Sequence, residues 1–226
     1  MNVKSNMPSV IRKTTATLAF SLLSIASAQA STSTVSGTIH QQTNPNATTL
    51  DYWRIDLSAD SVFEVDVLAN EGYLTSKPGP PGAYSDLNGD GEITLMDSHL
   101  RIYKNSVATA NEVATADDSA AYSDGSGDGW GDGSLNSRDS YGMWEFTAGT
   151  YILAFGDYNV QAADPVAGIN AGDTLGSNQT HADYQIKFAA DVPFTVTPTT
   201  VPLPAAVWLF GSAIAGLGFF GRKKQA

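Results

Sequence analysis

Six oxygen-bearing residues within residues 86–97 have the spacing of a cation-binding loop. In such loops positions 1, 3 and 5 supply side-chain oxygens, position 7 a backbone carbonyl, position 9 often a bound water, and position 12 a closing carboxylate. Gly91 stands at position 6, where the chain must turn sharply. Ca²⁺ requires six to eight hard oxygens at about 2.3–2.6 Å, so this pattern predicts a Ca²⁺ site. The expected ligands, in that order, are Asp86, Asn88, Asp90, Glu92, Thr94 and Asp97.

The spacing of this loop resembles that of EF-hand and dockerin loops. Asp97 rather than Glu closes it, as in dockerin-type loops, and this shortens the bidentate reach. Both flanks differ from an EF-hand, because residues 77–85 are too rich in Pro and Gly for a helix and residues 98–103 favour a strand. We therefore expect one isolated loop on a β-domain, with an affinity on the order of 10⁻⁴–10⁻³ M. The alternative is an acidic turn that binds no ion.

A second acidic and glycine-rich stretch occupies residues 124–133. The closing position of a loop that starts at Asp124 is Leu135, which has no ligand oxygen, so a solvated loop is favoured over a second ion site. Trp130 in this stretch offers either an aromatic face for a sugar ring or a side chain that packs on the sheet.

Composition and charge narrow the possible functions. The chain has 12 Lys and Arg against 23 Asp and Glu, a formal net charge of −11, which argues against a nucleic-acid-binding protein. It has no cysteine, which excludes disulfides, a thiol nucleophile and Cys-based zinc sites. His40, His99 and His181 fit no metal-ligand motif, and no nucleophile elbow or phosphate-binding glycine loop is present. We expect a non-catalytic protein, with a glycosidase-type carboxylate pair as the alternative.

Residues 1–30 have the features of a secretory signal peptide, expected as a helix. Basic residues come first, an apolar run from Ala16 to Ala28 follows, and no acid is present. Ala28 and Ala30 are the small residues that signal peptidase recognises, so cleavage is expected after Ala30.

The last 26 residues have three parts. An uncharged stretch over residues 205–221 reaches the lower limit for a membrane-spanning helix, and the basic residues 222–224 follow it. The positive-inside rule keeps that basic end cytoplasmic and the acidic body outside. The first part is the motif Val201, Pro202, Leu203, Pro204 and Ala205.

This order resembles the PEP-CTERM class of bacterial sorting signals, in its VPLPA variant. Pro202 and Pro204 stand where the family motif has them. The resemblance implies a Gram-negative envelope protein that an exosortase, a membrane transpeptidase, processes near the motif. The tail would then anchor the chain to the inner membrane transiently, and the product would be secreted or held in the cell envelope.

The body of the chain has the period-2 alternation of β-strands. Trp53, Ile55 and Leu57 share one face of one strand, and no capped helix is evident between residues 31 and 195. An all-β fold is expected, an antiparallel β-sandwich or jelly roll over residues 31–192. The expected strands are 52–57, 62–67, 99–103, 142–147, 150–156 and 183–188.

The strand order over residues 48–190 resembles that of bacterial pre-peptidase C-terminal domains. The resemblance rests on the runs DYWRIDLSADSVFEVDVLA, LRIYKN and GTYILAFGDY and on Asp117-Asp118-Ser119. It implies a non-catalytic β-sandwich, and we expect no accompanying catalytic domain. Residues 193–200 are expected to be an extended spacer before the sorting signal at 201–226.

Three functions are compatible with these features. The first is a secreted, non-catalytic envelope or extracellular-matrix protein with a Ca²⁺-stabilised sandwich, near exopolysaccharide. The second is a Ca²⁺-dependent carbohydrate-binding or adhesion module that uses Trp130 or Tyr122 as a platform. The third is an enzyme. The partners implied are signal peptidase and an exosortase, with no nucleic acid.

Overall fold

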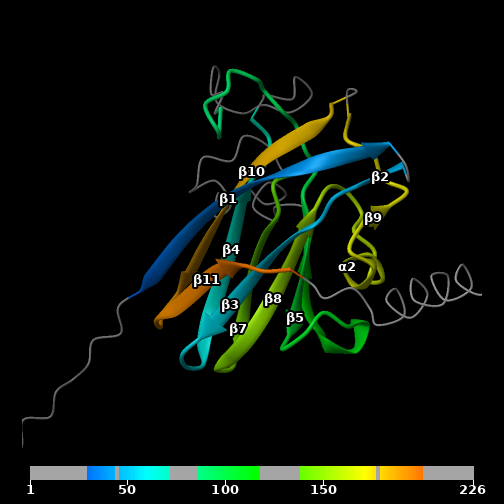
Figure 1. Cartoon of the computed structure of the whole chain (residues 1–226). Coiled ribbons are helices and arrows are strands. Elements are labelled where there is room, and N and C mark those ends of the chain that lie inside the picture. Colours follow the sequence, from blue (N-terminus) through cyan, green and yellow to red (C-terminus); the bar gives the residue numbers. More distant parts are fainter. Residues whose placement is uncertain (1–29, 44–45, 72–85, 118–137, 177–178, 201–226) are drawn as a thin grey trace, which may run out of the picture.

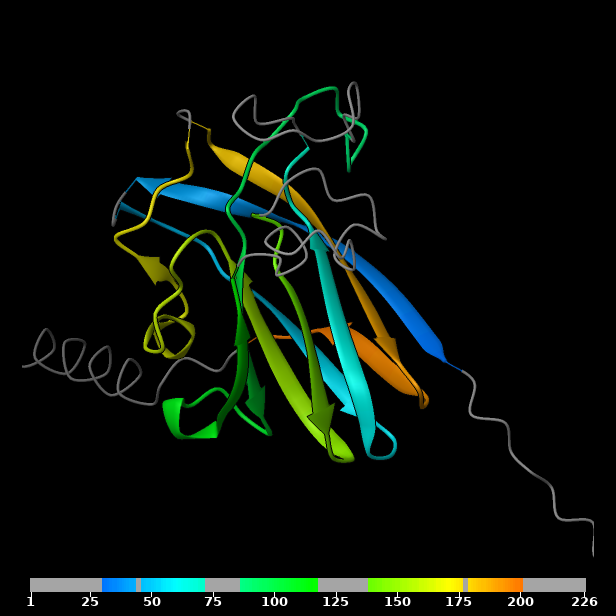
Figure 2. The same cartoon turned by 180° about the vertical axis from the view of Figure 1, so that it is seen from behind.

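Two antiparallel β-sheets make up the fold in the computed structural model of the chain (Figures 1 and 2). The structure describes residues 30–43, 46–71, 86–117, 138–176 and 179–200. The first sheet has six strands in the order β7-β4-β10-β1-β2-β9. Their bounds are β7 (Tyr141–Phe146), β4 (Ser61–Leu68), β10 (His181–Ala190), β1 (Ser31–Thr43), β2 (Asn46–Thr48) and β9 (Asn170–Ala171).

The second sheet has five strands in the order β11-β3-β8-β5-β6. Its strands are β11 (Phe194–Pro198), β3 (Asp51–Leu57), β8 (Gly149–Gly156), β5 (His99–Lys104) and β6 (Glu112–Ala116). A 3-10 turn, η1 (Thr109–Asn111), and a one-turn helix, α2 (Asp164–Ala167), complete the regular structure of these residues.

All six strands expected from alternation are present, as β3, β4, β5, β7, β8 and β10. The expectation of an all-β fold with antiparallel sheets is therefore confirmed. The alternation did not reveal β1, β2, β6, β9 and β11. In β1 the sequence STSTVSGTIHQQT offers few apolar residues, and the strand is held instead by ten paired positions along β10.

One hydrophobic core lies between the two sheets. The first sheet contributes Phe63, Val65 and Ile186, and the second contributes Ile55 and Leu153, all at most 1% exposed. Aromatic pairs join the sheets, with ring centroids 4.6 Å apart for Phe146–Tyr151 and 4.3 Å for Phe155–Tyr184. Burial of this apolar surface is the main force that holds the two layers together.

Residues 194–198, expected to belong to a spacer, form β11. They are extended, as their Pro and Thr content suggests, but they pair with β3 from Phe194↔Leu57 to Pro198↔Trp53. Phe194 packs edge-on against Phe63 at 5.4 Å. The folded domain therefore reaches Pro198 rather than ending at residue 192.

The segment from Asp157 to Gly176 covers the outer face of the second sheet at one end. Arg101 Nε donates to the Val160 carbonyl at 2.7 Å, and the Tyr52 hydroxyl donates to the Pro165 carbonyl at 2.9 Å. The expected signal peptide, sorting motif and membrane helix lie outside the described residues. None of the helices within the described ranges is long and apolar enough to span a membrane.

Candidate metal centre

Residues 86–91 form a tight turn that the side chain of Asp86 holds. Its Oδ1 accepts the Gly89 N–H at 2.6 Å and its Oδ2 accepts the Gly91 N–H at 2.9 Å. Gly91 has φ +86°, a left-handed conformation that favours glycine, so the sharp turn expected at position 6 is present. Two smaller turns follow, since Asn88 Oδ1 accepts the Asp90 N–H and Asp90 Oδ1 accepts the Glu92 N–H. These bonds hold the side-chain oxygens of Asp86, Asn88 and Asp90 along one short turn.

The loop packs on the outer face of the first sheet, where β4 ends and β10 begins (Figure 1). The side chains of Ala182 and Tyr184 on β10 point into the core, so Asp183 points to the other face. An outward carboxylate is normally solvated, yet Asp183 is only 2% exposed. Asn88 Nδ2 reaches Asp183 Oδ2 at 2.9 Å, and Thr38 Oγ1 on β1 donates to Asp183 Oδ1 at 2.6 Å.

Two carboxylates from distant parts of the sequence face each other here. The amide nitrogen of Asn88 donates to Asp90 Oδ2 at 2.8 Å and to Asp183 Oδ2, and so bridges them. His181 Nε2 lies 3.8 Å from Asp183 Oδ2 and 3.4 Å from Glu92 Oε2. Within the described part of the chain, Asp90, His181 and Asp183 are the one group whose ligand atoms all lie within 4.8 Å of one another.

Hydrogen bonds and charge favour the ionised form of Asp90. The pKa of Asp90 is lowered by the backbone N–H of Glu92, by the side chain of Asn88 and by the nearby His181. Asp90 is exposed to solvent, whereas Asp183 is buried on strand β10. A cation approaching from solvent would meet Asp90 first and the rigid β10 strand behind it.

The fully buried Glu71 ties the two halves of the loop to the end of β4. Its Oε1 accepts the Leu87 N–H at 2.6 Å, and its Oε2 accepts both the N–H and the hydroxyl of Thr94, at 2.7 and 2.8 Å. Thr94, expected to hold a water at position 9, also accepts the Asp183 N–H with its hydroxyl at 2.9 Å. Its side chain is therefore engaged in positioning the loop.

Asp97, expected to close the loop, is directed elsewhere. Its Oδ2 lies 3.4 Å from Arg138 Nε, and the residue lines a cavity with Asp157. In an EF-hand a helix follows the loop, whereas here the chain runs extended from Leu95, which bridges to Asn70, into β5. An extended chain rises about 3.3 Å per residue and carries position 12 away from positions 1 to 5.

The donor set suits a hard cation. Oxygens of Asp86, Asn88 and Asp90 lie on one short turn, and Asp183 supplies a carboxylate from the sheet. Asn88 Nδ2 occupies the position between Asp90 and Asp183 that a bridging cation would take, and Asn88 Oδ1 accepts the Asp90 N–H. His181 adds a nitrogen of the kind that transition metals prefer, and the carboxylate and amide side chains add oxygens of the kind that Ca²⁺ prefers.

Three residues of this arrangement were not identified from the sequence as part of it: Glu71, His181 and Asp183. Asp183 alternates with core residues, so its type and position predict only a solvated outer face. A buried carboxylate on an outer face signals a covering loop, but burial is visible only in the structure. Glu71 lies three residues after the end of β4 and belongs to no ligand spacing in the sequence.

The stretch 124–133, with Trp130, and also Tyr122 lie outside the described residues. No family model matches the chain, and no curated protein shows significant similarity to it. Neither comparison supplies a function, a cofactor or a partner.

Proposed function

We propose that this protein is an exported, non-catalytic component of the bacterial envelope or extracellular matrix, whose β-sandwich is stabilised by Ca²⁺ at the loop of residues 86–91. The observation that carries the proposal is the packing of this loop on the buried Asp183. Asp86, Asn88, Asp90 and Asp183 are the proposed side-chain ligands. His181 groups with Asp90 and Asp183 and lies 3.4 Å from Glu92 Oε2, so it is a further proposed donor at the same site.

Electrostatics gives the cation a structural role. Burying Asp183 beside Asp90 costs free energy, because like charges repel and water is excluded from one of them. The Asn88 amide offsets part of this cost with two hydrogen bonds. A divalent cation would replace one partial positive charge with two full ones and would fix the loop to both β10 and β1.

Thermal unfolding with 10 mM Ca²⁺ and with chelator tests the proposal. For a dissociation constant of about 0.1–1 mM, this concentration stabilises the folded state by about 1.4–2.7 kcal/mol. That corresponds to a rise in melting temperature of roughly 3–10 °C for a domain of this size. Zn²⁺ and Mg²⁺ in parallel establish which class of cation the site takes.

Asp183→Asn is the informative variant, because it keeps the shape of the side chain and removes one ligand charge. The rise with Ca²⁺ should disappear in this variant. It should persist in Asp191→Asn, whose carboxylate is exposed and distant in sequence from the loop. A Ca²⁺ shift of equal size in Asp183→Asn and wild type would contradict the assignment of Asp183 as a ligand.

Export and processing rest on the two termini and need a separate experiment. Expression in a Gram-negative host with an exosortase should release a form that lacks residues 1–30 and the membrane segment after the motif. Replacing Pro202 and Pro204 with Ala should leave the full tail in the membrane fraction, as measured by mass spectrometry. An unchanged product would contradict sorting at the motif.

A further inference from the structure

The first part of strand β1 has one edge that no strand of the described residues pairs with. β1 pairs with β10 from Ser31 to His40, but on its opposite edge β2 pairs only with residues 41–43. In Figures 1 and 2 this part of β1, drawn in blue, runs beside β10 and forms the border of the sheet. Such an edge presents backbone N–H and C=O groups to which the strand of another chain can pair.

The outward backbone groups of β1 belong to its even-numbered residues. The Gln41 N–H donates to the Thr180 carbonyl on the β10 side, whereas the His40 carbonyl accepts the Thr49 N–H on the opposite side. Since successive residues of an antiparallel strand direct these groups to alternate sides, the open edge is formed by Thr32, Thr34, Ser36 and Thr38. Thr49 closes this edge at His40, so it is open over residues 32–38.

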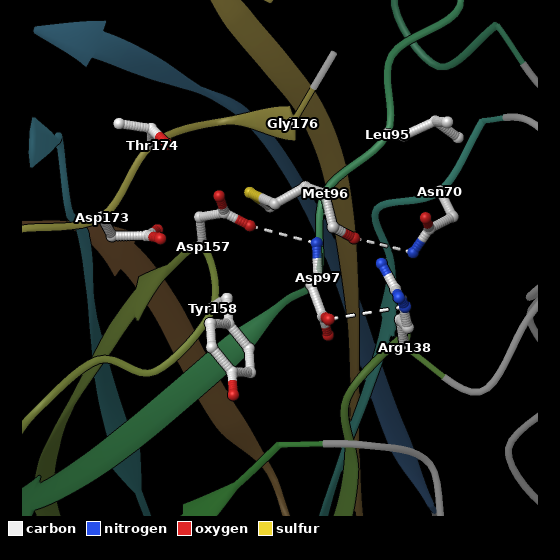
Figure 3. A pocket seen from close by; sticks show the side chains of 10 residues that line it. All are labelled: Asn70, Leu95, Met96, Asp97, Arg138, Asp157, Tyr158, Asp173, Thr174 and Gly176. Atoms are coloured by element: carbon white, nitrogen blue, oxygen red, sulfur yellow. Dashed lines mark hydrogen bonds and ion pairs between the residues drawn. The ribbon is translucent and has the colours of Figure 1, made fainter.

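The polar cavity near Asp97 differs from this edge, because its polar groups bond to one another. The Asp97 N–H donates to Asp157 Oδ1 at 3.1 Å, and Asp97 Oδ2 lies 3.4 Å from Arg138 Nε (Figure 3). The outward backbone groups of residues 32–38 have no strand partner among the described residues and are available to a second chain.

β1 also lacks the features that protect exposed edge strands from pairing. Proteins commonly block such edges with charged side chains, Pro, bulges or short strands. The 13 residues of β1 include no Pro and no Lys, Arg, Asp or Glu, and the register with β10 runs without a bulge. The edge strand of the other sheet, β11, is five residues long, ends at Pro198 and follows Pro193. One edge is therefore protected, while the other is open to pairing.

The distribution of charge favours the approach of a second copy at this edge. The chain has a formal net charge of −11, so two copies repel each other unless they meet at an uncharged surface. Residues 31–50 and 192–200 contain no Lys, Arg, Asp or Glu, and the strands that they contribute, β1 and β11, contact each other. Pairing along β1 therefore brings no carboxylates directly opposite each other.

We propose that two copies of this chain pair antiparallel through the open edge of β1 and form a dimer with a continuous sheet. The dimer goes beyond the proposed function and depends neither on Ca²⁺ nor on processing of the tail. Because one strand pair forms a small interface, the dimer is weak and its population depends on protein concentration.

One register uses all four outward residues. A two-fold axis at Val35 places Thr34 opposite Ser36 of the second copy, and Thr32 opposite Thr38 of the second copy. Each of these pairs exchanges two backbone hydrogen bonds, about eight in the whole interface. Val35 then lies opposite its own copy in a non-hydrogen-bonded pair, where side chains are closest. Its side chain already packs against the core, so the pairing extends the core from one copy to the next.

Disulfide cross-linking of Val35→Cys tests this register, because the chain has no native cysteine. In the proposed dimer the two Cα atoms are about 4.5 Å apart, within the range of about 4.4–6.8 Å for disulfides. Oxidation of the full-length variant in mild detergent should give mostly covalent dimer on non-reducing electrophoresis. The proposal would be overturned by a monomer at about 0.5 mM, where even a dissociation constant of about 0.1 mM gives mostly dimer.

Thr32→Cys is the matched control on the same strand. Thr32 is exposed whereas Val35 is half-buried, so random collisions would cross-link Thr32→Cys faster. In the proposed register the two copies of Thr32 lie six positions apart along the strand, about 20 Å, and should not cross-link. Cross-linking of Thr32→Cys at the rate of Val35→Cys or faster would overturn the antiparallel register.

Ser36→Pro tests the dimer without an added thiol. The Ser36 N–H points away from β10, so Pro leaves the β10 ladder intact and removes a donor that the second copy needs. In sedimentation of the full chain in mild detergent, dimer affinity should be at least about tenfold weaker than for wild type. Met143→Ala, on the edge strand β7, should associate as wild type does. A melting temperature within about 3 °C of wild type confirms that each variant is folded. Equal association of Ser36→Pro and wild type would overturn the proposal.

Discussion

Gly37 on β1 lies directly opposite Tyr184 on β10 and makes room for that ring. The Tyr184 hydroxyl donates to Asp51 Oδ2 at 2.6 Å and accepts the Trp53 indole N–H at 3.0 Å, in a network that ties both sheets together. A Cβ added at Gly37 would lie 2.6 Å from Tyr184 Cζ and 2.7 Å from Asp51 Oδ2, with the Tyr184 hydroxyl closer still. Gly37→Ala therefore forces the ring, the carboxylate or the β1 backbone to move.

The expected cost has two parts. Overpacking of a dense core costs about 1–3 kcal/mol, because fully buried Tyr184 has no free space to enter. Loss of the hydrogen bond to the Asp51 carboxylate costs about 1.5–3 kcal/mol more, since burial already raises the pKa of Asp51 and this bond stabilises its charge. Together the free energy of unfolding should fall by roughly 2.5–6 kcal/mol, or the melting temperature by roughly 5–24 °C.

The assay is urea unfolding followed by tryptophan fluorescence, to which Trp53 contributes. Gly176→Ala is the matched control, because Gly176 has an ordinary φ and no atom lies within 4 Å of its added Cβ. Its free energy of unfolding should stay within about 0.5 kcal/mol of wild type. In a Tyr184→Phe background the Gly37→Ala change should cost less, because the closest atom is gone. Equal stability of Gly37→Ala and Gly176→Ala would refute the reasoning.

Three further changes test the core and the edges. His99 is 8% exposed, and burial lowers its pKa to about 4, below the ordinary value of 6.5, so the unfolded state binds the proton more readily. The contribution of neutral His99 to the free energy of unfolding should be fully present above pH 6.5 and should fall by up to about 3 kcal/mol as the pH drops to 4. Thermal melting at a series of pH values should show a smaller loss in His99→Gln. An identical pH profile in wild type and His99→Gln would contradict this prediction. Asp139 accepts three buried hydrogen bonds at the end of β4. Asp139→Ala should therefore lower the free energy of unfolding, measured by denaturant titration, by at least about 2 kcal/mol. An unchanged free energy of unfolding would count against a stabilising role for those bonds. Phe194→Ala should cost about 1–3 kcal/mol because its ring packs on Phe63, and no change in melting temperature would mean that β11 is dispensable.

The local sequence predicted those strands whose side chains alternate strongly. In β4, Phe63, Val65 and Val67 face the core and are separated by Glu64 and Asp66, so the period of 2 is visible in the sequence. β1 and β11 are rich in Ser and Thr and gain their strand structure from pairing with β10 and β3. Pairing partners are set by the whole fold, so a window of residues cannot identify such strands.

The sequence by itself determined the β-strand character of the body and the turn at residues 86–91. Both depend on neighbours in the chain: alternation along a strand, and a glycine at the position where φ must be positive. Only the tertiary structure decided which groups meet the turn. Asp183 lies 95 residues from Asn88, Glu71 approaches from β4, and Asp97 departs with the extended chain toward Arg138. Contacts over such separations depend on how the sheets pack, because residue spacing specifies local geometry and not which distant side chains a loop covers.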